Sequence, residues 1–311
     1  MNVALGGQAI AAEQRLPLGF SKKSTLALVC LCAGIAPLAA RWIPDDVVRI
    51  SYGLLVSVAY LAFTLFARKR ASLRQFWELS LAFFVLALFS VLNGSIPGYV
   101  ATYILHAPPN AGNPMASTVS GTVVIQLLET FIAIVPVIVA TLVSGRDLGS
   151  IYVQKGVMGK WLVLAIGFFV AFYLFLLTIP LRPDSPARQL LPSDSTLSVD
   201  RVLALTPALL VVAISNGFFE EEFLFRGLFL QKYEWLFGAR VANVLQAAIF
   251  AIAHVGITYT PSALLFIVVF VFPLGLIAGY LMRATRSVIT PGIFHGALDM
   301  GIYLAFLSYV S

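Results

Sequence analysis

Residues 202–230 of the chain read VLALTPALLVVAISNGFFEEEFLFRGLFL, an apolar stretch with a cluster of charges toward its end. A helix needs about 20 mostly apolar residues to cross the hydrocarbon core of a bilayer, so this stretch is long enough to tilt or to protrude. Charged side chains at membrane depth are costly, and they persist where a partner or a water-filled cavity receives them. The stretch therefore predicts a membrane-spanning helix whose charged residues have a function.

The rest of the chain repeats the apolar pattern. Of the 311 residues, 60% are hydrophobic and only 11% are charged, so the bilayer must be the solvent. The apolar runs lack the alternation of barrel strands, and helices satisfy their own backbone groups in lipid. We expect an all-α, polytopic transmembrane helical bundle of about eight to nine spans. The candidate runs are 24–40, 51–67, 77–93, 121–143, 161–180, 202–230, 241–258, 262–282 and 288–309.

The net charge of +6 follows the topology of these spans and indicates no nucleic-acid partner. Basic residues gather before the first run and after the second and fourth, whereas the loop 94–120 has no Lys or Arg. The loop 41–50 balances Arg41 and Arg49 with two Asp. Since basic loops stay on the cytosolic side, we expect a cytosolic N-terminus, an external loop 41–50 and an external C-terminus.

Three parts follow from this organisation: a polar N-terminal tail at 1–23, a group of about five helices at 24–195, and a C-terminal membrane domain at 196–311. A loop rich in Pro and Ser at 181–200 separates the two helical groups. The second group holds nearly all the ionisable residues at membrane depth. Glu129, in the fourth run, is the exception, and we interpret it as a polar packing contact.

The first candidate site residues lie at 220–226. Glu222 and Arg226 are four residues apart, so they can pair on one face of a helix. Glu221 lies about 100° further round an α-helix and would be free to act on water. Glu220 is interpreted as a residue at the helix end, in the cytosolic interface.

The other candidates lie on two later helices. His254 belongs to the run 241–258, and His295 with Asp299 belongs to 288–309. The four-residue spacing lets the Asp299 carboxylate fix the tautomer of His295 or raise its pKa. The usual zinc-protease helix, serine elbow and two-aspartate templates are all missing. A glutamate and two histidines on three helices allow either direct activation of water or a bound metal.

The expected depths of these residues conflict. A seventh helix that starts at 241 places His254 about 20 Å along its axis, nearer the outer face than Glu221 should be. Tilting, a later helix start or a span that turns back around 258–261 would each reconcile the two positions, and the sequence does not choose among them.

The three motifs, Glu221-Glu222-x-x-x-Arg226, Phe250-x-x-x-His254 and His295-x-x-x-Asp299, resemble those of the CAAX-protease and bacteriocin-processing (Abi, CPBP) family over about 196–311. The resemblance implies an intramembrane endopeptidase. In it, Glu221 assisted by His254 would deprotonate water, while His295 and residue 299 would stabilise the oxyanion, with Glu222 and Arg226 as supports.

One residue departs from the prenyl-protease pattern, which has Asn where this chain has Asp299. An ionised Asp cannot donate to an oxyanion, so Asp299 must be protonated, orient His295 or belong to a metal site. We expect no obligatory cofactor. In the alternative, Zn²⁺ would be held by Glu221, Glu222, His254 and His295.

The implied partners are a peptide or lipidated peptide and membrane lipids, in a bacterial cell membrane or, in a eukaryote, that of the endoplasmic reticulum. Two other functions stay open. A proton-coupled transporter would use Glu222, Arg226 and Asp299 as a relay, because intramembrane acids are common in such proteins. A non-enzymatic membrane scaffold would retain a degenerate site.

Overall fold

A computed structural model describes residues 20–106, 118–157, 159–178, 198–255 and 261–308. Within these ranges every regular element is a helix, and seven helices are long and apolar enough to cross a membrane. The prediction of an all-α polytopic bundle is confirmed. The tail at 1–19 and the loop segment 256–260 lie outside the described residues.

The predicted runs correspond to helices with somewhat different ends. The first group consists of α1 (Phe20–Leu38), α2 (Asp46–Lys69), α3 (Trp77–Asn93), the short α4 (Ile96–Tyr99), α5 (Val119–Val143) and α6 (Gly159–Thr178). The second group consists of α7 (Val199–Ala213), the π-helix η7 (Ile214–Gly227), α8 (Leu228–Phe237), α9 (Ala239–Ala253), α10 (Pro261–Phe266), the π-helix η9 (Ile267–Val271), α11 (Phe272–Thr285) and α12 (Ile289–Ser308).

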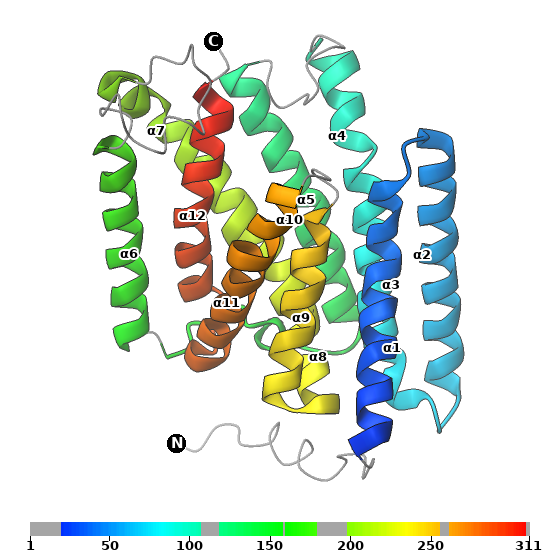
Figure 1. Cartoon of the computed structure of the whole chain (residues 1–311). Coiled ribbons are helices and arrows are strands. Elements are labelled where there is room, and N and C mark those ends of the chain that lie inside the picture. The colour runs from blue at the N-terminus through cyan, green and yellow to red at the C-terminus, as the bar shows by residue number, and fades with distance from the viewer. Residues whose placement is uncertain (1–19, 107–117, 158, 179–197, 256–260, 309–311) are drawn as a thin grey trace.

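The π-helix η7 lies at the centre of the bundle, packed against α5, α8, α9 and α12. Figure 1 shows α1, α2 and α3 on one side of the molecule and α6 on the other, with α9, α11 and α12 between them. The start of α1 and the end of α12 lie at opposite ends of the bundle in this view. Helices from both sequence groups therefore surround the segment that carries the glutamates.

Apolar packing divides into two clusters around η7. The larger joins α1, α3, α5, α8 and α9, and the smaller joins α7 and α12 with partly buried residues of α6. Residues of η7 such as Phe223 and Phe225 belong to the larger cluster, whereas Ala297 and Met300 of α12 belong to the smaller. The polar residues of η7 and α12 are thus held between two packed apolar bodies.

The conflict over depth is resolved by the hairpin of α8 and α9. The predicted end of the sixth span at 230 is wrong, because the helical run continues to Phe237 and reverses at Gly238, whose φ of +82° favours glycine. Glu221 lies 17 residues before Gly238 and His254 lies 16 residues after it. With similar rises along two antiparallel helices, both residues reach the same depth.

The π-helical backbone changes the expected angle between neighbouring glutamates. A π-helix has i→i+5 hydrogen bonds and so more residues per turn than an α-helix, which brings successive side chains closer in direction. The side chain of Glu221 therefore does not point away from that of Glu222. Both carboxylates reach the same imidazole ring, that of His295.

Candidate active site

Glu221 lies between two imidazole rings that come from different helices. Its Oε1 is 3.5 Å from Nε2 of His254, at the end of α9, and its Oε2 is 3.1 Å from Nε2 of His295, on α12. Oε2 is buried, and among the described residues it has no partner with hydrogen-bond alignment. It therefore keeps lone pairs that could accept a proton or a hydrogen bond from water.

His295 is held from both edges of its ring. Nδ1 is 2.9 Å from Oε1 of Glu222, and Nε2 faces Glu221 at 3.1 Å. Since an ionised carboxylate only accepts, Nδ1 donates to Glu222, and the contact of Nε2 with Glu221 is an ion-pair distance without hydrogen-bond alignment. The nearest oxygen of Asp299 is 3.8 Å from Nε2. The hydrogen bond that orients the ring is thus made by Glu222, and Asp299 lies within ion-pair distance of the other nitrogen.

His254 is oriented by its own helix. Its Nδ1 is 2.9 Å from the backbone oxygen of Phe250 one turn earlier. A carbonyl can only accept, so Nδ1 donates, and in a neutral ring Nε2 is left without hydrogen. Nε2 points toward Glu221 and can accept a proton or a hydrogen bond there.

Arg226 supports this arrangement through contacts with Glu222 and Phe250. Its side chain is fully buried, with Nη1 at 3.3 Å from Oε1 of Glu222. The guanidinium carbon lies 3.9 Å from the centre of the Phe250 ring, a cation–π contact. The same ring meets His254 and His295 edge-on, at centroid distances of 4.7 and 5.6 Å. Phe250 thus contacts the arginine and both histidines.

Asp299 is positioned by the start of η7. Asn216 Nδ2 donates to Asp299 Oδ2 at 3.0 Å. Gly217 lets the helices approach, since a Cβ there would lie 2.6 Å from the same oxygen and 2.9 Å from the backbone nitrogen of Gly296. One carboxylate oxygen is therefore engaged by Asn216, and the other faces His295.

Glu220 is not at a helix end, as we expected, because the helical run continues to Phe237 and the side chain lies inside the bundle. It is 6% exposed, and its Oε2 accepts a hydrogen bond of 2.9 Å from Gln126 on α5. Gln126 Oε1 accepts in turn from the hydroxyl of Tyr303 at 2.5 Å, and its Nε2 lies 3.4 Å from Asn216 Oδ1. A buried polar network thus links α5, η7 and α12 behind Asp299.

Exposure separates the six predicted residues into two sets. The side chains of Glu221 and His254 retain 14% and 24% of their accessible surface, whereas His295 and Asp299 retain 2% and 5%. Glu222 and Arg226 are fully buried. Glu221 and His254 are therefore the most exposed of the six residues, and the other four form the wall behind them.

The four ligands expected for Zn²⁺ do not fit one metal ion. Glu222 contacts Nδ1 of His295, while Glu221 contacts Nε2 on the opposite edge of the ring. The two carboxylates therefore approach different sides of the imidazole, and among the described residues the carboxylate near Nε2 of His254 is that of Glu221. No group of three or more His, Cys, Asp or Glu in the described ranges is arranged to hold a metal.

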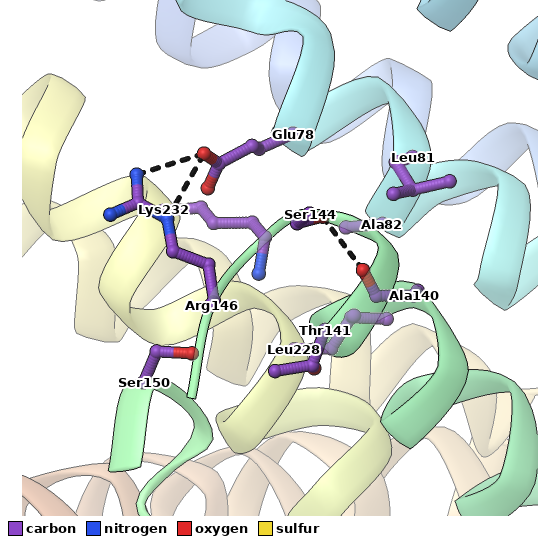
Figure 2. Close-up of a pocket in the computed structure, with 10 residues that line it drawn as sticks. All are labelled: Glu78, Leu81, Ala82, Ala140, Thr141, Ser144, Arg146, Ser150, Leu228 and Lys232. Atoms are coloured by element: carbon purple, nitrogen blue, oxygen red, sulfur yellow. Dashed lines mark hydrogen bonds and ion pairs between the residues drawn. The ribbon is translucent and has the colours of Figure 1, made fainter. Parts of the chain in front are cut away.

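A pocket elsewhere in the bundle contains none of these residues. Figure 2 shows Glu78 of α3, Arg146 and Lys232 of α8 around a hollow at one end of α5. Arg146 donates to Oε1 of Glu78 through Nε and Nη2, at 3.1 and 2.8 Å. This pocket joins the two helical groups but has no glutamate–histidine pair.

Sequence reasoning gave no role to Gln126, Asn216 and Phe250. Asn216 stands in the quoted stretch 202–230 and Phe250 in the second motif, but their partners lie on other helices and no spacing reveals them. Gln126 is a polar residue in an apolar run, which is the one signal that could have marked it.

Comparison with known families supports the reading of this region. Residues 202–301 match a family model described as Type II CAAX prenyl endopeptidase Rce1-like. The matched segment contains all six predicted site residues. Neither the comparison with curated proteins nor that with solved structures found a match. The resemblance of the C-terminal helices to the CAAX-protease family is thus confirmed over residues 202–301.

Proposed function

We propose that this integral membrane protein is an intramembrane endopeptidase that hydrolyses a peptide bond near the membrane surface. The observation that carries the proposal is the position of the Glu221 carboxylate, 3.5 and 3.1 Å from the imidazoles of His254 and His295 on two other helices. The family similarity of residues 202–301 gives the reaction class. No metal takes part in the proposed steps.

In the first step, Glu221 Oε1 and His254 Nε2 each accept a hydrogen bond from one water molecule. The two acceptors hold the water so that a lone pair faces the substrate. As its oxygen bonds to the scissile carbonyl carbon, one proton passes to Glu221 and the carbonyl π electrons move to oxygen. General base catalysis of this kind contributes about 10²–10⁴ in rate.

The second step collapses the tetrahedral intermediate. The N–H at Nε2 of His295 donates to the oxyanion, and Glu222 holds the ring from its other nitrogen. The proton on Glu221 then moves to the amide nitrogen, the C–N bond breaks, and the products are a carboxylic acid and an amine. Asp299 lies beside Nε2 and favours the protonated ring through its negative charge.

The substrate class is a peptide, with or without a lipid group, whose scissile bond reaches the partly exposed face of Glu221. Such a peptide would enter from the membrane or its surface, because apolar side chains surround the site. Membrane lipids would then surround both the protein and the lipid group of such a substrate.

The test is cleavage of a fluorescence-quenched peptide by the purified full chain in liposomes. Glu221→Gln removes the base but keeps the size of the side chain, so kcat should fall at least about 100-fold. Glu234→Gln is the matched control. Glu234 lies on the same helical run as Glu221, but it pairs with Arg283 of α11 and touches none of the six residues. Equal rates for wild type and Glu221→Gln would refute the assigned role.

A second arm of the assay addresses metal dependence. The protein is dialysed against a strong chelator, and the rate is measured with and without added Zn²⁺. The proposal expects the same kcat in both samples. Activity that disappears on dialysis and returns with Zn²⁺ would contradict a mechanism in which Glu221 itself activates the water.

A further inference from the structure

Arg41 reaches the candidate active site from a part of the chain that the family model does not cover. It belongs to the 3₁₀ turn η1 (Ala39–Trp42) that follows α1. Its Nη1 donates a hydrogen bond of 2.7 Å to the backbone oxygen of Ala253, 212 positions later in the sequence. Ala253 is the last residue of α9 and directly precedes His254.

This contact completes the end of α9. The last carbonyls of a helix have no donor within the helix and need other partners. Here Phe250 O accepts from the ring of His254, and the next two carbonyls face the backbone N–H of His254. The last carbonyl, that of Ala253, accepts from Arg41. A cation at this end is also favoured by the helix dipole.

The charge of Arg41 also acts on the site. Glu220, Glu221 and Glu129 lie within electrostatic range of its guanidinium. Arg41 therefore adds a positive charge near these carboxylates from the turn that follows α1. This position also gives Glu129 of α5 a charged neighbour.

We infer that Arg41 is a positioning residue that holds the end of α9 so that Nε2 of His254 stays against Glu221. The catalytic part of this inference rests on the proposed function. Arg41 acts through the backbone of Ala253, and the residue it places is the one that orients the water. The first helices thus complete the site that the C-terminal helices carry.

The experiment compares kcat and KM of Arg41→Met and Arg41→Lys in the liposome assay. Methionine keeps bulk but removes donor and charge, so kcat should fall at least about tenfold while KM stays within about twofold, because misplaced catalytic groups slow the chemical step. Lysine keeps a donor and the charge, and its kcat should stay within about threefold of wild type. Arg49→Met is the matched control, since Arg49 pairs with Asp46 and Gly94 O away from the site.

Three kinetic results would overturn the inference: wild-type kcat in Arg41→Met, an equal loss in Arg41→Lys, or an equal loss in Arg49→Met. Hydrogen exchange gives a readout that needs no activity. Peptides covering 250–255 should exchange faster in Arg41→Met than in wild type or Arg49→Met, and unchanged exchange would show that Arg41 does not hold this helix end. A wild-type protein that cleaves no peptide would overturn the proposed function, and the exchange result would still decide whether Arg41 holds α9.

Discussion

At the scale of single residues, the site depends on one buried ion pair that also orients a catalytic ring. Glu222 Oε1 contacts both Nη1 of Arg226 and Nδ1 of His295. Burying two charges is costly, and their attraction offsets this only while both are present. The pair therefore contributes to placement of the ring more than to net stability.

This view makes a prediction for Glu222→Gln. The amide oxygen can still accept from His295, but the buried Arg226 charge loses its ion-pair partner. An unpaired buried charge of this kind destabilises a protein by about 3–5 kcal/mol. When the purified Glu222→Gln protein is unfolded in detergent by heat or denaturant, it should be clearly less stable than the wild type.

A second variant separates charge from shape. Adding Arg226→Met removes the stranded charge, so the double variant should be more stable than Glu222→Gln alone. If Glu222→Gln unfolds at the wild-type midpoint, or if Arg226→Met adds a further loss, the buried ion pair does not have the role described.

At the scale of elements, the π-helix η7 and the hairpin of α8 and α9 bring the residues together. Long π-helices are rare, and short ones often mark functional sites. In η7 the wider turn directs Glu221 and Glu222 to opposite edges of one ring, and Gly217 lets α12 approach closely enough to present that ring. The site is thus a consequence of backbone register as well as of residue type.

The close approach predicts the effect of Gly217→Ala. The added Cβ would lie 2.6 Å from Asp299 Oδ2 and 2.9 Å from Gly296 N, so α12 must shift. Overpacking of this kind costs about 1–3 kcal/mol. We expect lower thermal stability and a lower rate of peptide cleavage, although alanine favours helices more than glycine does.

The control for this prediction lies on α12, the helix that packs against Gly217. A Cβ at Gly301 would meet Phe172 at 3.4 Å, an ordinary contact, so Gly301→Ala should leave stability and cleavage close to wild type. Equal behaviour of Gly217→Ala and Gly301→Ala would show that the spacing of η7 and α12 does not matter.

The elements differ in how far the sequence reveals them. Apolar length reports directly on membrane crossing, so the helical runs were predictable, and the spacing of Glu222 and Arg226 indicated their pairing. The sixth run was placed too short because Gln231, Lys232 and Glu234 reduce its apolar character although the helix continues past them. The π-helix was missed because apolar spacing does not encode the register of backbone hydrogen bonds.

At the scale of the whole molecule, the two sequence groups form one bundle, and helices of the first group contact the site at two places. Arg41 joins the end of α1 to the end of α9, and Gln126 joins α5 to Glu220. Neither contact was predictable, since each pairs residues more than 90 positions apart. In addition, a charged residue such as Arg41 is common in a loop between membrane helices and gives no sign of a contact with the site. The grouping of Glu221 with the two histidines was expected from motif resemblance, and spacing alone could not have given it.

The central claim is that Glu221 and His254 act on one water molecule in the intact bundle. Single-turnover cleavage of the reporter peptide by Glu221→Gln, His254→Ala and the double variant tests it most directly, because groups that act as a unit show strongly non-additive losses. We predict that the double variant is no slower than the slower single variant. Losses that multiply, or a single variant with the wild-type rate, would contradict a shared water.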